Sequence, residues 1–315
     1  ANRAGGARLI ELASRYGLET LTAAMRETLD YAERRTRAAI ERMEDGEREA
    51  TDVLEGADAD LELRLKATVE GDELALDFTG SADQYDGNLN CPLAVTTSAC
   101  YFAVRVLADP DVPPCAGAYR PITVRAPEGS ILNARPPAAV AGGNVETSSR
   151  VADLVLQAFG RALGQGTMNN LTLGNDDFAY YETLGGGQGA CDDADGPSAV
   201  HVAMSNTLNT PVEALELEFP LRAVEYAVRR GSGGNGRHRG GDGVTRELEA
   251  LTEMTYSLIT ERRRHRPKGA AGGEPGAAGR NLVNGEEVPP KAAGTLRRGD
   301  RLRIETPGGG GHGNG

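Results

Sequence analysis

One set of residues suited to chemistry stands where a Gly-Asn loop leads into an amphipathic helix. Asn144, Glu146 and Arg150 lie there, and apolar residues then recur at helical spacing up to residue 163. Free backbone amides at a helix start, together with the helix dipole, favour an anion. Arg150 beside them could contact a phosphate or an oxyanion. The alternative is that Asn144 or Thr147 simply caps the helix.

A second set follows the alternating segment 199–204, which predicts a strand containing His201. Asn206 and Asn209 come next, and glycine clusters at 185–189 and 231–243 bracket the whole stretch. Glycines let backbone amides approach a ligand closely. The two asparagines and these amides are therefore candidate phosphate or oxyanion contacts. His201 could act as an acid or base, although a lone histidine in a strand is more often structural.

Metal and nucleophile motifs are absent from the sequence. The histidines are scattered, with none in an HxH, HxxxH or HExxH pattern, and the cysteines form no CxxC pair. GxSxG and Walker A sequences do not occur. The residues alone therefore assign no metal ligand and leave the catalytic groups unknown. The residues concerned are His201, His238, His265, His312, Cys91, Cys100, Cys115 and Cys191.

The composition argues against a nucleic-acid-binding protein and against a membrane protein. The chain has 315 residues and a net charge of −12, without the basic stripe that nucleic-acid binding requires. No apolar run approaches the ~20 residues that span a membrane. The cysteines are typical of reduced, mostly buried thiols, so we expect a cytoplasmic protein that binds neither nucleic acid nor membrane.

The elements that must position these residues divide the chain into a helical and a β-rich part. Helical periodicity covers residues 1–45, alternation predicts a hairpin over 60–79, and an apolar run predicts a core helix over 92–107. A second core helix follows at 151–163, ended by Gly164. The proline-rich segment 110–137 indicates an extended connection with a strand at 122–125.

The sequence of the C-terminal half predicts strands joined by glycine-rich loops. Segments 246–251 and 255–260 resemble paired strands, 282–288 a hairpin turning at Asn284-Gly285, and 302–304 a last strand. The basic run 261–267 could face a carboxylate-rich partner surface or an anionic ligand, or be a solvated turn. We therefore predict an α+β protein with N-terminal helices, a β-hairpin and two core helices, then the β-rich half. The expected domains are a helical segment 1–56, a mixed core 57–184 and a β-rich glycine-loop region 185–315.

Long motifs resemble those of the hydantoinase B family. They are GNLNCPLAVTTSA (87–99), PEGSILNARPPAAVAGGNVETSSRVADLVLQA (127–158), DGPSAVHVAMSNTLNTPVEALELEFPLR (195–222), GSGGNGRHRGGDGVTRE (231–247), ERRRHRPKGAAGGEPGAAGRN (261–281) and the closing TPGGGGHGNG (306–315). The family contains the B component of N-methylhydantoinase, the matching half of 5-oxoprolinase and the large subunit of acetone carboxylase.

This resemblance implies part of an ATP-dependent cyclic amide hydrolase. An A-type ATP-binding subunit would phosphorylate the amide oxygen, and a divalent metal would activate water for ring opening. The family's metal ligands precede the region that resembles this chain, so we expect metal and ATP to be bound mainly outside it. The chain would then be a C-terminal portion or split subunit that works with the upstream metal-bearing portion. An acetone-carboxylase-type subunit and a non-catalytic scaffold half are the alternatives.

Overall fold

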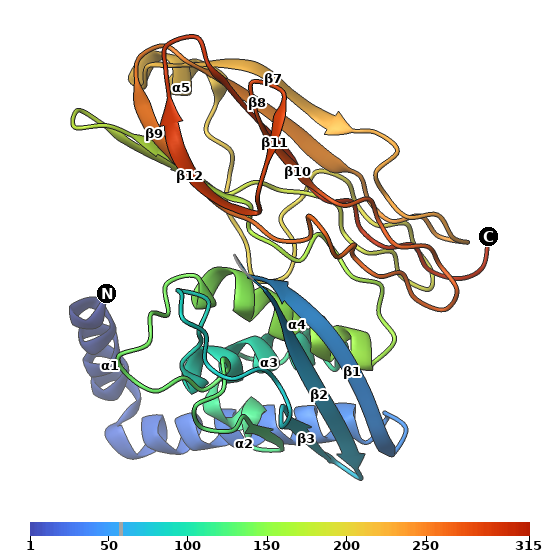
Figure 1. Ribbon diagram of the computed structural model, residues 1–315. Helices are drawn as coiled ribbons and strands as arrows, with labels where there is room; N and C mark the ends of the chain where they lie inside the picture. Colours follow the sequence, from blue (N-terminus) through green and yellow to red (C-terminus); the bar gives the residue numbers. More distant parts are fainter. Residues whose placement is uncertain (57–58) are drawn as a thin grey trace.

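The computed structural model describes residues 1–56 and 59–315 and shows two lobes (Figure 1). The N-terminal lobe contains α1 to α4 and the sheet β1 to β4, whereas the C-terminal lobe contains β5 to β13 and α5. Helices and mainly antiparallel sheets are thus segregated, and the α+β class predicted from the sequence is confirmed.

The sheet of the N-terminal lobe has the order β1-β2-β3-β4. The predicted hairpin is confirmed as an antiparallel pair, β2 and β3, joined by a turn in which Gly71 has φ 59. Strand β1 was not predicted, because its inward-facing residues include the charged Asp52 between Ala50 and Leu54, which hides the apolar alternation. The strands are β1 (Gly46–Glu55), β2 (Asp60–Glu70), β3 (Glu73–Asp77) and β4 (Ile122–Arg125).

Two helices cover one face of this sheet and form the first core with it. Residues of α3 and α4, such as Cys100 and Leu154, pack against Leu65 of β2 and Leu76 of β3. Helix α3 begins after Pro92, as the sequence predicts. Helix α4 ends well before Gly164, followed by Gly160 with φ 70. The helices are α3 (Leu93–Leu107) and α4 (Ser148–Ala158).

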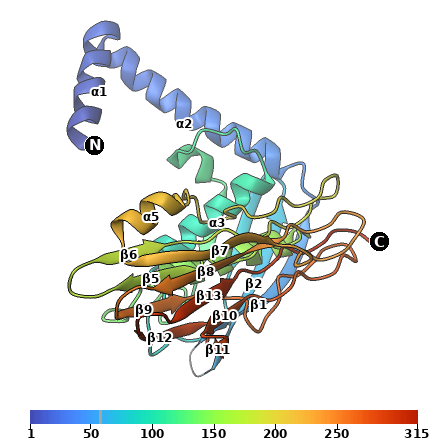
Figure 2. The ribbon, with the colours of Figure 1, turned by 90° about the horizontal axis from the view of Figure 1, so that it is seen from above.

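Helices α1 (Asn2–Tyr16) and α2 (Leu18–Ile40) meet at Gly17, which has φ 84. Ile40, at the end of α2, is buried in the first core. Helix α1 instead projects from the lobe (Figure 2) and leaves apolar side chains such as Ile10 (70% exposed) in contact with solvent.

Two sheets pack face to face in the C-terminal lobe, with orders β11-β10-β13-β8-β7 and β12-β9-β5-β6. Leucines from both sheets form the second core. The elements are β5 (Asn170–Gly174), β6 (Ala179–Glu182), α5 (Val212–Glu218), β7 (Leu221–Arg229), β8 (Gly243–Ala250), β9 (Met254–Ile259), β10 (Arg280–Val283), β11 (Glu286–Val288), β12 (Lys291–Leu296) and β13 (Arg301–Glu305).

The strands predicted at 246–251, 255–260, 282–288 and 302–304 are present, whereas β5, β6, β7 and β12 were not predicted, and one predicted pairing is wrong. Strand β8 pairs with β7 and β13, whereas β9 lies in the other sheet and pairs with β5 and β12. The short link between them crosses from one sheet to the other. The hairpin of β10 and β11 is confirmed, and Asn284 and Gly285 have the positive φ values (51 and 86) that its tight turn needs.

Four glycine-rich segments, 185–197, 231–242, 267–279 and 307–315, run side by side as a layer that we call the glycine bundle (Figure 1). Their amides bond to carbonyls of neighbouring segments, as in Gly309 N to Gly241 O (2.9 Å) and Gly234 N to Gly309 O (2.9 Å). A Cβ at Gly309 would overlap the carbonyl oxygen of Gln188. The glycines are therefore required by backbone packing, and these amides are not free for a phosphate.

The expected domain limits at 56/57 and 184/185 differ in how they relate to the two lobes. Strands β5 and β6 join the C-terminal lobe through β9, across the limit expected at 184/185. The limit expected at 56/57 falls at residues 57–58, which lie outside the described residues.

Further observations concern membrane spans and cysteines. Within residues 1–56 and 59–315, no helix has the length and apolar character needed to cross a membrane. All four cysteines are free thiols, and burial raises the pKa of Cys91 to about 12.

Candidate functional site

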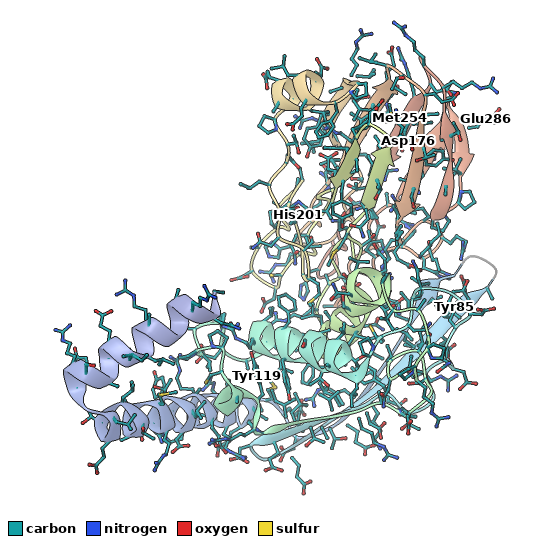
Figure 3. The ribbon with its side chains drawn as sticks, turned by 90° about the vertical axis from the view of Figure 1, so that its left-hand side faces the viewer. Tyr85, Tyr119, Asp176, His201, Met254 and Glu286 are labelled. Atoms are coloured by element: carbon teal, nitrogen blue, oxygen red, sulfur yellow. The ribbon has the colours of Figure 1, made fainter. Side chains whose placement is uncertain are left out.

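The candidate residues lie at the junction of the two lobes. The N-terminal lobe contributes the start of α4, and the C-terminal lobe contributes the segment before β5, the loop 198–211 and the residues after β9. Figure 3 shows His201 on that loop, between the helices of one lobe and the sheets of the other.

Helix α4 is entered through a π-helical turn, Gly143–Thr147. This turn packs against the loop before α3, and a Cβ at Gly143 would overlap the carbonyl oxygen of Asn90. Asn90 is itself buried and bonds to the backbone at Tyr85, Gly87 and Ala139, so its amide serves to hold the loop.

The capping role suggested for Asn144 or Thr147 is wrong. Neither the π-helical turn nor α4 has a side-chain cap in the described chain, and Asn144 is exposed. The Thr147 hydroxyl donates instead to the carbonyl of Leu89 (2.5 Å). The amides of residues 142, 143, 145 and 146 donate to backbone carbonyls, so these donors are already used.

Glu146 is fully buried in the π-helical turn, and its carboxylate is half satisfied. Oε1 accepts hydrogen bonds from Thr167 Oγ1 (3.1 Å) and Met168 N (3.3 Å), whereas Oε2 has no partner among the described residues. Burial, with the nearby charge of Glu261, raises the pKa of Glu146 to about 7. Glu146 can therefore take up or release a proton near neutral pH.

Arg150 is also fully buried, and its guanidinium bonds to carboxylates of its own chain. Nη1 donates to Asp52 of β1 (3.2 Å) and to Asp153 of α4 (3.2 Å), and Nη2 donates to Glu261 (3.3 Å). The phosphate contact suggested for Arg150 stays a prediction. What the structure shows is a guanidinium that joins β1, α4 and the C-terminal lobe.

Arg262 completes this group, which we call the junction cluster: Asp52, Arg150, Asp153, Glu261 and Arg262. Arg262 holds Asp52 in a bidentate pair (3.1 and 2.8 Å) and contacts Asp153 Oδ2 at 2.6 Å. Glu261 also pairs with Lys291 of β12. All five members of the cluster are buried, so each charge depends on its partners rather than on water.

The basic run after β9 therefore has a divided role. Arg262 is buried against carboxylates of this same chain, whereas Arg264 and Arg266 are exposed. The carboxylates that Arg262 meets belong to β1 and α4 of this chain, and a partner surface or an anionic ligand for the exposed part of the run stays a prediction.

The strand predicted over 199–204 is wrong. One bridge links Val200 to Gly186, and the rest of the segment is irregular because Ala199 and Ala203 have φ values of 57 and 50. The loop that results turns the imidazole of His201 toward hydroxyl groups.

His201 lies between two hydroxyls. Its Nδ1 is 3.0 Å from Ser205 Oγ, and its Nε2 is 3.0 Å from Thr207 Oγ1. Ser205 Oγ donates to the carbonyl of Val202, so it accepts from Nδ1–H. This network assigns the proton to Nδ1 and leaves the Nε2 lone pair facing the Thr207 hydroxyl.

Burial lowers the pKa of His201, which keeps the imidazole neutral at neutral pH. A neutral imidazole whose Nε2 faces an exposed hydroxyl can accept a proton from that hydroxyl, or from water bound beside it. The arrangement is a base held in its tautomer by Ser205, with Thr207 at the surface.

The structure groups five of the six sequence-predicted residues into two sets and leaves Asn144, which is exposed, outside both. Glu146 and Arg150 gather around Glu261, whereas His201, Asn206 and Asn209 share the loop 198–211, where both asparagines are exposed. A chain of contacts connects the sets. The Thr207 hydroxyl bonds to the Thr183 hydroxyl. The amide of Leu184, which follows Thr183, donates to Met168 O (3.0 Å), and the Met168 amide donates to Glu146.

Sequence reasoning missed the partners that give these residues their properties. Asp52 and Asp153 carried no signal, because neither belongs to a metal or nucleophile motif and their arginine partners come together only in the fold. Thr207 adjoins Asn206 in the sequence, yet only the irregular fold of the loop brings it to His201.

Metal ligation does not fit the described residues of this chain. No group of three or more His, Cys, Asp or Glu in the described ranges is placed to hold a metal ion. The buried carboxylates of the junction cluster face arginines and a lysine instead, which satisfies their charge.

Comparison with known proteins identifies the family to which this chain belongs. A family model described as Hydantoinase B/oxoprolinase matches residues 1–315. The chain belongs to the hydantoinase B/oxoprolinase family. It is 38% identical over 333 residues to 5-oxoprolinase 1 of Arabidopsis thaliana, covering 100% of this chain and 26% of that protein. The family resemblance drawn from the motifs is thus confirmed.

Solved structures share the fold of this family member. The crystal structure of the ATP-dependent caprolactamase from Pseudomonas jessenii matches with a TM-score of 0.88 and 27% identity, covering 99% of this chain and 59% of that chain. Nucleotide-free acetone carboxylase matches with a TM-score of 0.84 and 17% identity, over 97% and 50% of the two chains, which shows the fold alone. This chain spans less than two thirds of each of these three proteins.

Proposed function

We propose that this chain takes part in ATP-dependent ring opening of a cyclic amide, as the C-terminal portion or split subunit of a larger hydrolase. The observation that carries the proposal is the 27% identical match to an ATP-dependent caprolactamase over 99% of the chain. A relative at 38% identity is named a 5-oxoprolinase, and 5-oxoproline and caprolactam are both lactams.

The His201–Thr207 pair supplies proton transfer in this proposal. Water attacks the carbonyl carbon of an amide whose oxygen has been phosphorylated at the expense of ATP. Its proton passes through the Thr207 hydroxyl to His201 Nε2. The ring C–N bond then breaks as the ring nitrogen takes up a proton, which leaves an acyl phosphate. A second water hydrolyses this acyl phosphate and releases the carboxylate and inorganic phosphate. The lowered pKa of His201 keeps the acceptor in its basic form.

ATP and a divalent metal complete the assembly from outside this chain. The described residues do not fit a metal site, so the upstream portion of the family's polypeptide is its proposed holder. An A-type subunit is the proposed ATP-binding partner. The thiols of Cys91 and Cys100 are free and buried, which suits the cytoplasm as the place where this assembly works.

The test is substrate-dependent ATP turnover by the complete complex. The chain is purified with the upstream portion and the ATP-binding subunit, then given ATP with 5-oxoproline, caprolactam or a hydantoin. ADP and the ring-opened acid are measured by chromatography. One arm replaces the lactam with acetone and bicarbonate.

Ring-opened acid formed together with ADP supports the proposal. Bicarbonate-dependent ATP turnover with acetone would instead establish the carboxylase function, and normal turnover in the absence of this chain would make it dispensable. In the active complex, His201→Asn should slow ring opening by about 100-fold. His238→Asn, a half-buried histidine of the glycine bundle, is the matched control.

A further inference from the structure

A cavity of about 430 Å³ lies at the lobe junction, and His201 is not among its lining residues. Residues of the edge strand β1 form one wall, from Thr51 to Val53, and the segment from Arg264 to Lys268 forms the other. Because the two walls come from different lobes, anything bound there contacts both. Its size is within the range of sites for small molecules, roughly 300–1,000 Å³.

The second wall carries several basic side chains. Arg264, Arg266 and Lys268 are all exposed, and all three line the cavity. His265 also lines the cavity. The whole chain has a net charge of −12, so this concentration of positive charge is a local exception that attracts anions.

The balance of charge within the cavity leaves a surplus. The side chains of Arg264 and His265 share the carboxylate of Asp60. Their backbone amides donate to the buried carboxylate of Glu55. Arg266 donates to the carbonyls of residues 275 and 276, and Lys268 Nζ donates to the carbonyl of residue 51 and the side-chain oxygen of residue 157. In the described chain, neither Arg266 nor Lys268 has a carboxylate within ion-pair distance.

The two acidic residues of the lining do not remove this surplus. Asp52 is buried, and its oxygens accept from the guanidinium groups of Arg262 and Arg150. Glu62 is bonded to Arg64. Two cations therefore remain for a ligand, together with the neighbouring Arg264 and His265.

We infer that this cavity binds a small phosphate-type dianion. Arginine guanidinium groups match the oxygens of phosphate in a two-bond geometry, and lysine adds a point charge. Two unpaired cations balance a dianion. Such a ligand would bridge the lobes beside the junction cluster and stabilise the folded chain by mass action. The inference does not depend on the proposed ring-opening function.

The test uses inorganic phosphate, pyrophosphate and succinate as probes, with isothermal titration calorimetry and thermal unfolding on the full chain. Phosphate or pyrophosphate should bind the wild type and raise its melting temperature. Arg266→Gln with Lys268→Gln should weaken that binding at least about tenfold and abolish the thermal shift. Arg298→Gln, which removes an exposed arginine of the C-terminal lobe, should leave both unchanged.

Three results would overturn the proposed anion site or its ligand. Tighter binding of succinate than of phosphate would overturn the phosphate-type ligand. Absence of binding by the wild type at 100 mM ionic strength, or equal affinity in the double variant, would overturn the site itself. The melting temperature of the double variant without ligand separates lost binding from lost folding. If that variant unfolds early, Lys268→Arg must retain affinity within about threefold, because it keeps the charge.

Discussion

Replacing Arg262 with methionine tests how the two lobes are joined. Arg262 is fully buried, has φ 60, and makes the bidentate pair with Asp52 and the contact with Asp153. Methionine has a similar length and the same unbranched Cβ, so the backbone strain at this position is unchanged. What the substitution removes is the positive charge and its hydrogen bonds.

The expected cost follows from the carboxylates left behind. Asp52 and Asp153 would share the single guanidinium of Arg150, which also serves Glu261. Breaking a buried ion pair by removing one partner costs about 3–5 kcal/mol, because a charge is left uncompensated away from water. We expect the free energy of unfolding of Arg262→Met to fall by that amount.

Urea unfolding, followed by circular dichroism and extrapolated linearly to water, measures this loss. Arg298→Met is the control and should stay within about 0.5 kcal/mol of wild type, since Arg298 is exposed. Adding Asp52→Asn to Arg262→Met should recover part of the loss because one unpaired carboxylate disappears. A loss below about 1 kcal/mol, with no recovery in the double variant, would refute the reasoning.

Three further predictions concern the carboxyl, the glycine bundle and the base. Burial raises the folded-state pKa of Glu146 from 4.5 to about 7, so its contribution to stability is lost as pH rises through that window. The free energy of unfolding of Glu146→Gln, relative to that of the wild type, should therefore rise by on the order of 3 kcal/mol between pH 4.5 and 8 in urea unfolding. A difference between the two proteins that stays constant with pH would contradict this. Gly309→Ala should cost at least about 3 kcal/mol in the same assay because its Cβ meets a carbonyl, whereas exposed Gly6→Ala should gain about 0.5–1 kcal/mol; equal midpoints would rule out tight packing of the bundle. In steady-state kinetics of the complete complex, Thr207→Val should lower kcat more than KM changes, and the acidic limb of the kcat profile should vanish in His201→Asn; a retained limb would assign the base elsewhere.

The sequence predicts the local elements well where one physical rule governs them. Apolar alternation predicts the hairpin of β2 and β3, and Asn284-Gly285 predicts the turn of the last hairpin. Strand β1 escapes detection because Asp52 replaces an apolar residue on its inner face. Its partners, Arg150 and Arg262, are 98 and 210 residues away in the chain, which no local pattern can convey.

The candidate site was predictable as a set of residue types but not as an arrangement. His201 drew attention as a lone histidine, yet its tautomer depends on Ser205 and Thr207, which the positive φ values of the loop bring to it. The glycines were expected to offer amides to a ligand. They offer them instead to one another, because a layer of closely packed backbone satisfies its own hydrogen bonds.

The proposed function couples ATP hydrolysis to lactam opening in a complex that includes this chain. The most direct measurement is the ratio of ring-opened acid to ADP released by the complete complex, with wild-type chain and with His201→Asn. We predict a ratio near one for the wild type and a large loss of acid formation in the variant. Undiminished acid formation by the variant, or ADP release that no cyclic amide stimulates, would contradict the account.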